Sequence, residues 1–385
     1  MATPSVSIPP YGIDVRSPSM VPVGRLGRIT SLKVTPRFNA VGAFEMTLPF
    51  QDPKAQLLNK GCWVQFTSND NVVLAGQIRG RKIIEDESNI GGTLTVYGPS
   101  AEQIIADHLA YQVPTSVATS QGADDYDNRT GAAESVIKAY VNMNAGPGAL
   151  FARRSITPVS IEWDQGRGST VKASARMDNL LELIAGLCTA GGLGFRVVFG
   201  SGNTLEFQVY APVDRSGSAK FGAELGNLVS YEYTEEASTA TAAVIGGGGD
   251  GISRTFREIV DTTAQTEWTH RTEVFLDQRD TTDAAELDQA GAAAVVEKGP
   301  VKGLAIKTAD TPNLRFNREY YLGDRVSVPA AGITDILREV EIEWSADKGP
   351  STSSTVGTAS TTGSLKMLTL LDDLNYRVAA LERTK

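Results

Sequence analysis

One stretch of the sequence has the residue types and spacing of a phosphate-binding turn: AAVIGGGGDGISR, residues 242–254. Gly246, Gly248 and Gly251 fit the pattern G-x-G-x-x-G, in which backbone amides at the start of a helix hold the pyrophosphate of a dinucleotide. Such a site requires a strand before the glycines and a helix that begins at the third one. The segment TATAAVI predicts the strand, whereas ISRTFREIVDTT is rich in β-branched residues and favours a second strand at least as well.

The glycines also fail the other phosphate-binding pattern, because no Lys-Ser or Lys-Thr pair follows them as a P-loop requires. Glycine has a second use, since it reaches backbone angles that other residues avoid and lets another segment approach closely. We therefore expect a structural turn rather than a nucleotide site, made by Gly246, Gly247, Gly248, Gly249, Gly251 and Arg254.

Two acidic segments could carry other chemistry. DDYDNRTG, residues 124–131, resembles a calcium loop, but Arg129 stands where an oxygen ligand is needed, so a solvated turn is the better interpretation. In SIEWDQGRGS, Glu162 and Asp164 are two residues apart and would share one face of a strand. A carboxylate pair of this kind could perform acid–base hydrolysis, although surface carboxylates at this spacing are common.

The two cysteines and two histidines add little further chemistry. Cys62 and Cys188 lie far apart in apolar segments, which is typical of buried free thiols rather than of a disulfide framework or a metal site. Only His108 and His270 could serve in a Ser-His-Asp arrangement, and His108 shares a helical face with isoleucines, as a packing residue does. We expect no catalytic residues, no metal site and no cofactor, and the chain is not predicted to be an enzyme.

Bulk properties exclude several classes of protein. The chain has 385 residues, enough for two to four domains, with 41% hydrophobic and 21% charged residues. Its net charge of −9 and the lack of a basic run argue against specific nucleic-acid binding. No apolar run is long enough to span a membrane, and the N-terminal sequence has no secretory signal pattern.

Residues 1–99 predict a β domain, the first of the domains that must position these residues. Within it, CWVQFT and VVLAGQI predict a hairpin. Residues 100–212 predict an α+β domain. Its first helix would start with a capping box of Ser100 and Gln103, and two further helices are expected over 132–143 and about 177–188. The strands GFRVVFG and LEFQVYA follow.

A second β domain with one helix, from about Asp283 to Glu297, is predicted over residues 213–346. The segment TEWTHRTEVFL is expected to be a strand. In DILREVEIEWSAD, alternation predicts a half-buried strand with an acidic outer face. Four of its residues are expected to point inward: Ile336, Val340, Ile342 and Trp344.

The C-terminal part has a different composition. Residues 347–364 are rich in Ser, Thr and Gly and predict a flexible linker. Residues 365–385 predict a helix with a heptad seam, formed by Met367, Leu371, Leu374, Val378 and Leu381. Two heptads are too short to be stable alone, so this helix either pairs between chains already held together or packs on its own domain.

Four segments in order resemble one known family: GRITSLKVTPRFNAVGAFEMTLPF, DNLLELIAGLCTAGGLGFRVVF, AVIGGGGDGISRTF and REYYLGDRVSV. They are similar to the minor tail proteins of siphophages, especially of actinobacterial hosts, that form the baseplate hub at the tail tip. The resemblance covers about residues 20–345 and excludes the linker and the heptads. It implies a multidomain β-rich fold in which two β-barrel-like hub domains flank an α+β domain.

The resemblance also implies a function. Hub proteins of this type are trimers whose barrel-like domains close a pseudo-sixfold ring and form the channel for DNA ejection. Expected partners are two further copies, the distal tail protein or tail tube, the receptor-binding, fibre or other tip proteins, and the tape measure protein. The protein would be made in the host cytoplasm and located in the virion.

Two other functions remain open from the sequence. A carbohydrate-binding tip module could recognise the host cell wall through the aromatic-rich third domain or the long loop at 111–130. An enzyme could use the glycine turn for a nucleotide, or Glu162 and Asp164 for wall hydrolysis.

Overall fold

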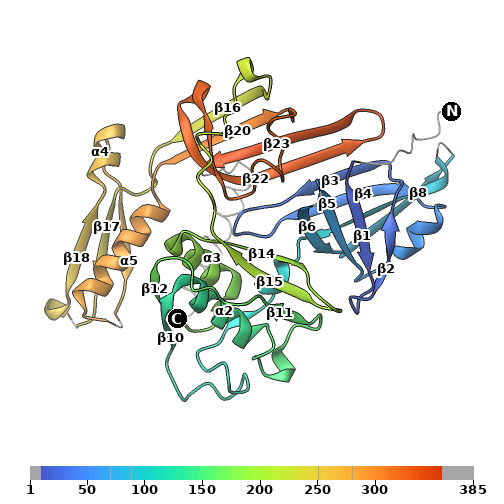
Figure 1. Cartoon of the computed structure of the whole chain (residues 1–385). Helices are drawn as coiled ribbons and strands as arrows, with labels where there is room; N and C mark the ends of the chain where they lie inside the picture. Colours follow the sequence, from blue (N-terminus) through green and yellow to red (C-terminus); the bar gives the residue numbers. More distant parts are fainter. Residues whose placement is uncertain (1–9, 70, 88, 250, 280, 358–385) are drawn as a thin grey trace. The chain divides into compact units, whose positions relative to one another are not determined.

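The computed structural model describes residues 10–69, 71–87, 89–249, 251–279 and 281–357 (Figure 1). The chain forms two compact units. Unit 1 contains the described residues up to Tyr231 together with Ile306–Val356, and unit 2 contains Glu232–Ala305. The segment 213–346 therefore contributes to both units. No helix among the described residues has the length and apolar character needed to cross a bilayer.

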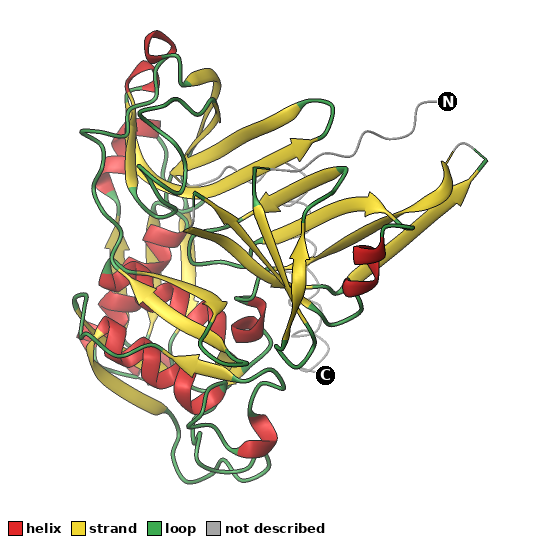
Figure 2. Ribbon diagram, turned by 45° about the vertical axis from the view of Figure 1, so that its right-hand side comes forward, coloured by secondary structure: helices red, strands yellow, loops and turns green. Residues whose placement is uncertain are grey.

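Unit 1 begins with a sandwich of two sheets (Figure 2). One sheet has the order β2-β1-β5-β6, and its strands are β1 (Gly12–Arg16), β2 (Pro22–Leu26), β5 (Trp63–Ser68) and β6 (Asn71–Gln77). The facing strands are β3 (Ser31–Thr35), β4 (Ala43–Pro49), β7 (Gly80–Asp86) and β8 (Asn89–Pro99). Buried side chains such as Phe66 and Met46 fill the space between the sheets. The predicted hairpin over β5 and β6 is confirmed.

The facing strands belong to a larger sheet that joins distant parts of the chain. Its order is β16-β20-β23-β22-β3-β4-β8-β7, with β21 paired to β22. The added strands are β16 (Leu228–Glu236), β20 (Val301–Thr308), β21 (Arg325–Val328), β22 (Ile333–Ser345) and β23 (Gly349–Gly357). The junction is the antiparallel pair β22–β3, in which Trp344 lies opposite Leu32.

This sheet corrects three expectations. None of the described sheets closes into a barrel, because β16 and β7 remain edge strands rather than pairing with each other. Residues 349–357 form strand β23 between β20 and β22, so the linker interpretation is wrong for them. Thr352 and Ser354 are buried there, since alternate residues of a strand paired on both sides face the protein interior. Residues 358–364 and the predicted C-terminal helix lie outside the described residues.

Strand β22 has the predicted acidic outer face over Glu339, Glu341 and Glu343, but its inward set differs at one position. A register shift between Leu337 and Glu339 changes the alternation, so Leu337 is fully buried in place of Ile336.

The α+β part of unit 1 packs helices α2 (Ala133–Asn144) and α3 (Leu180–Gly191) side by side (Figures 1 and 2). Both helices were predicted. Asn179 caps α3 by accepting hydrogen bonds from the Leu181 and Glu182 amides, and Gly192 ends it with a φ of 68°. The remaining elements are short: α1 (Gln103–Ala106), β9 (Leu109–Ala110), β10 (Asp127–Ala132), β11 (Val159–Ile161), β12 (Thr170–Ala175), β13 (Asp178–Asn179), β14 (Gly194–Phe199) and β15 (Leu205–Tyr210).

The capping box predicted for α1 is wrong. Ser100 is buried, and its hydroxyl accepts a hydrogen bond of 2.8 Å from the Gly42 amide instead of capping the helix. Helix α1 has only four residues and no side-chain cap. The Ser100 hydroxyl therefore binds the Gly42 amide in the tertiary structure, although the local pattern predicts that it caps helix α1.

Unit 2 is a three-stranded sheet of order β18-β17-β19 with helix α5 on one face (Figure 1). Its elements are β17 (Ala242–Gly246), β18 (Phe256–Val260), α4 (Thr262–Trp268), β19 (Glu273–Asp277) and α5 (Ala284–Glu297). Ile245, Leu287 and Val295 are part of its core. Helix α5 was predicted. The strand expected over TEWTHRTEVFL is correct only for β19, because Asp261 caps a helix that includes the start of that segment.

Candidate functional site

The glycine turn connects two antiparallel strands. Strand β17 ends at Gly246 and β18 begins at Phe256, directly opposite Gly246. Gly249 and Gly251 have φ values of +113° and +57°, which favour glycine. The segment after the glycines is therefore a strand, as the β-branched residues predicted, and not the helix that a dinucleotide site requires.

Two backbone amides of the turn already have partners within unit 2. The Gly247 amide donates to the Thr255 carbonyl and the Gly248 amide to the Thr281 carbonyl, both at 2.8 Å. A phosphate could bind these amides only by breaking those bonds, so the geometry contradicts the nucleotide interpretation.

Arg254 folds back over the glycines. Its Nε donates to the Gly247 carbonyl and its Nη2 to the Gly246 carbonyl, each at 3.0 Å, and Nη2 also pairs with Asp277. The guanidinium lies 5.5 Å from the ring centroids of both Phe256 and Phe275. All of these contacts are within one chain, so the small size of the glycines serves the internal packing of unit 2.

Glu162 and Asp164 do not form a carboxylate pair on a strand, because β11 ends at Ile161. Glu162 lies 3.2 Å from the Lys138 ammonium and 3.5 Å from the Arg167 guanidinium. Asp164 accepts a hydrogen bond of 2.6 Å from the Ser135 hydroxyl. Both carboxylates therefore have structural partners and are not arranged as an acid and a base.

Glu162 belongs to an ion cluster that the sequence did not reveal. At its centre is Glu134, which is fully buried and accepts from Lys138 Nζ at 2.6 Å and Arg167 Nε at 2.8 Å. Burial alone would raise the pKa of Glu134, but hydrogen bonds from Arg167 and Lys138 outweigh burial and lower it well below the ordinary range. The spacing of Glu134 and Lys138, four apart on α2, is the only local signal for this cluster.

The histidines and cysteines, which the sequence offered as further candidates for chemistry, do not form a common site in the described part of the chain. His108 Nδ1 contacts the Ile104 carbonyl at 2.7 Å and His270 Nε2 contacts the Ser238 carbonyl at 3.3 Å. Cys62 and Cys188 are buried free thiols, as predicted. Among the described residues no group of three or more His, Cys, Asp or Glu side chains could hold a metal ion.

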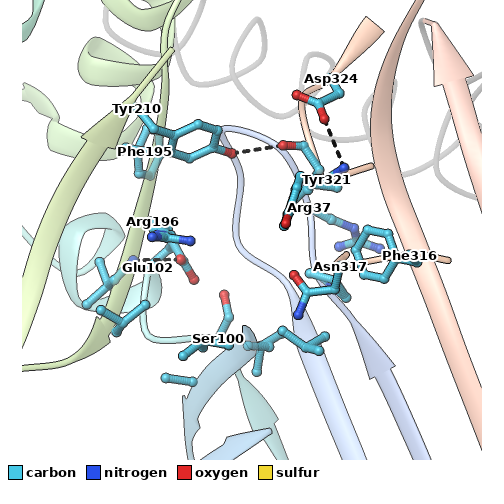
Figure 3. Close-up of a pocket in the computed structure, with 18 of the residues that line it drawn as sticks. Arg37, Ser100, Glu102, Phe195, Arg196, Tyr210, Phe316, Asn317, Tyr321 and Asp324 are labelled. Atoms are coloured by element: carbon cyan, nitrogen blue, oxygen red, sulfur yellow. Dashed lines mark hydrogen bonds between the residues drawn. The ribbon is translucent and has the colours of Figure 1, made fainter. Parts of the chain in front are cut away.

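Unit 1 contains a cavity of about 220 Å³ that the sequence did not predict (Figure 3). Its lining comes from six separate segments: residues 36–37, 72–75, 100–102, 195–198, 210–215 and 316–324. No local pattern could identify it, because each segment contributes only a few residues. The cavity thus marks the place where the sandwich, the α+β part and the segment before β21 meet.

Polar groups of the cavity are held by the backbone. The Tyr210 hydroxyl donates to the Leu322 carbonyl at 3.2 Å, and Glu102 accepts from the Val197 amide at 2.9 Å (Figure 3). Burial raises the pKa of both Glu102 and Tyr210. Asp324 accepts from Arg215 at 2.7 Å and from the Val213 amide at 2.9 Å. The bonds of Tyr210 and Asp324 thus join residues 210–215 to the segment before β21.

Three solved structures with a similar fold are tail proteins, two of them from prophages. The 43 kDa tail protein of prophage MuSo2 from Shewanella oneidensis has a TM-score of 0.57 and 13% identity over 90% of this chain and 98% of its own. A tail protein from Neisseria meningitidis MC58 has a TM-score of 0.53 and 13% identity, with coverages of 90% and 96%. Prophage tail protein gp18 from Listeria monocytogenes EGD-e has a TM-score of 0.51 and 10% identity, with coverages of 94% and 98%.

The fold is therefore that of a phage tail protein. The chain belongs to the family of siphovirus ReqiPepy6 Gp37-like proteins, whose model matches residues 13–358. It is thus a tail protein and a component of the virion, as the sequence resemblance predicted. Comparison with curated protein sequences gives no match.

Proposed function

We propose that this chain is the subunit of a trimeric hub at the tip of a phage tail, which joins the tail tube to the tip apparatus and surrounds the path of the ejected DNA. The observation that carries the proposal is the large sheet that contains β22 and β3, in a chain of the tail protein family. Strands from both ends of unit 1 form one sheet through the β22–β3 pair, and the α+β part is inserted between them. A trimer of subunits with two β regions each contains six β regions. Six regions match the sixfold symmetry of the tail tube, and three subunits match the threefold symmetry of the tip.

The partners follow from this position. The tail tube or distal tail protein would bind on one side, receptor-binding or fibre proteins on the other, and the tape measure protein would contact the hub. The heptad residues Met367, Leu371, Leu374, Val378 and Leu381 would continue the threefold axis or dock a partner. A net charge of −9 suits a channel that DNA must pass without binding, because like charges repel.

The native mass of the full chain over a range of concentrations tests the trimer. Three times 41.0 kDa supports the hub, and deletion of residues 364–385 then shows whether the heptads hold the trimer together. A stable dimer contradicts a threefold hub. Determining which residues face the channel tests the charge argument, which a basic lining would overturn.

A second function has one observation in its favour. On the face of the unit 2 sheet opposite α5, Phe256 and Phe275 are exposed, and exposed aromatic rings can stack on sugars. Phe316, just before the REYYLGD motif, and Tyr320, within it, are buried and cannot do so. A glycan array probed with the full chain and with Phe275→Ala tests this function: a signal lost in the variant would support wall recognition.

A further inference from the structure

The large sheet ends in two strands that carry exposed apolar side chains beside charged ones. In its strand order, β16 and β7 are the two outermost members, and no described strand pairs with the outer side of either. An edge strand directs backbone hydrogen-bonding groups away from its sheet and can pair with another chain. Proteins usually protect such edges with charge, proline or a covering element, so large apolar side chains left exposed on an edge strand favour a partner.

On β16, Val229 and Tyr231 are 63% and 48% exposed. They are two residues apart and so lie on the same face of the strand. Leu225, just before the strand, is also exposed. This edge therefore presents apolar side chains beside its backbone groups.

On β7, Ile83 and Ile84 are 49% and 42% exposed. They are consecutive and so face opposite sides of the strand, which means that each face of this edge presents one exposed isoleucine. Strand β7 carries Arg81 and Lys82 after its first residue and two acidic residues at its end, whereas β16 carries Glu232 at its centre and two further glutamates at its end. The two edges thus differ in shape and charge.

One antiparallel register places an acidic residue of β16 opposite a basic residue of β7. With Tyr231 placed opposite Ile83, Glu232 lies opposite Lys82 and Tyr233 opposite Arg81. Pairing of β7 with a second β7 would also place Lys82 against Glu85, but it would leave the apolar edge of β16 uncovered. In a ring of three subunits, only the pairing of unlike edges covers both strands in every subunit. An interface between unlike surfaces generates a ring when the rotation closes.

We infer that β16 of one subunit pairs antiparallel with β7 of a second copy of this chain, with Tyr231 opposite Ile83. This inference rests on the proposed trimeric hub and identifies the contact that closes it. In a closed ring of three subunits, each β16 and each β7 is used once, and the sheets become continuous around the ring.

Cross-linking tests the pairing directly. The full chain carrying Ile83→Cys and Tyr231→Cys is treated with a short thiol-specific cross-linker, which tolerates a register slip of one residue. Because Cys62 and Cys188 are buried, the parent chain should react little. We expect covalent dimers and trimers from the double variant and none from either single variant. Cross-linking of Ile83→Cys alone would show β7–β7 pairing and overturn the inference.

Charge reversal tests the register. Glu232→Lys and Lys82→Glu should each weaken association about tenfold, since like charges then lie opposite each other. The chain that carries both changes should regain the association of the parent, because the pair is restored in reversed order. Ile156→Asp changes a fully exposed isoleucine away from both edges and is the matched control.

The outcomes separate this inference from the proposed function. A trimer that resists both charge reversals and does not cross-link leaves the hub in place and overturns the edge pairing. A chain that stays monomeric at every concentration and does not cross-link overturns both.

Discussion

The guanidinium of Arg254 occupies the space that a side chain at position 246 would need. Its Nη2 lies 2.6 Å from the point where a Cβ on Gly246 would stand, and the same nitrogen donates to the Gly246 carbonyl at 3.0 Å. The glycine motif thus has an intramolecular explanation, because an arginine eight residues later uses the room that the glycine leaves.

Gly246→Ala should displace the guanidinium and lower the free energy of unfolding of unit 2 by about 1–3 kcal/mol. Arg254→Lys keeps the charge but cannot donate to both glycine carbonyls and Asp277, so a loss of similar size is expected. The two changes together should cost clearly less than their sum, because either one alone already removes the same contact. Additive losses in denaturant unfolding would show that the two residues are independent.

Glu134→Gln should destabilise unit 1 by about 3–5 kcal/mol, since it leaves Lys138 and Arg167 without the buried carboxylate that they share. The matched control is Glu182→Gln, an exposed carboxylate on α3, for which we expect a change within about 0.5 kcal/mol. Chemical denaturation monitored by circular dichroism measures both. Equal effects of the two variants would show that the cluster contributes nothing.

The same cluster predicts acid sensitivity. The folded pKa of Glu134 lies below its ordinary value of 4.5, so its contribution is complete above that pH and is lost as the pH falls from 4.5 toward the folded value. Melting temperatures between pH 7 and pH 3 should therefore fall more steeply for the parent than for Glu134→Gln. Parallel curves would contradict this origin of the acid sensitivity.

Glu102 should have the opposite pH dependence. Burial raises its folded pKa, so the carboxyl costs no stability while it is protonated in both states, below about its ordinary value of 4.5. The cost appears as the pH rises through the folded pKa. Glu102→Gln can still accept from the Val197 amide, and it should raise the melting temperature at pH 7 by roughly 2–4 °C, with no gain near pH 4. The Arg196 guanidinium lies near Glu102 and attracts its charged form (Figure 3). Destabilisation at pH 7 would show that this attraction outweighs the cost of burying the charge.

Ser353→Pro should unfold or strongly destabilise unit 1, by about 2–4 kcal/mol or more, because it removes a backbone donor from a strand with neighbours on both sides. Ser353→Thr keeps the donor and favours a strand, so it should be nearly neutral. Thermal unfolding distinguishes the two variants. If the segment were a flexible linker, both changes would have no effect.

Local patterns were enough to identify most elements. The hairpin of β5 and β6, helices α2, α3 and α5, and the hairpin of β14 and β15 follow from periodicity, turn residues and stop signals that act within a few residues. Predictions from local patterns were wrong where a residue or segment bonds to a partner that is distant in the sequence. Ser100 binds the Gly42 amide instead of capping α1, and residues 349–357 join a sheet although their composition is that of a linker.

The sequence by itself determined that the chain is β-rich with an α+β part, that its glycines favour a turn, and that it resembles siphophage tail proteins. These properties depend on residue types, on spacing and on the order of motifs along the chain. Only the tertiary structure decided that β22 pairs with β3, that Glu134 joins Lys138 and Arg167, and that six segments enclose one cavity. Each of these features brings together residues that are far apart in the chain, or depends on which of many possible partners a residue contacts. Long-range packing determines both.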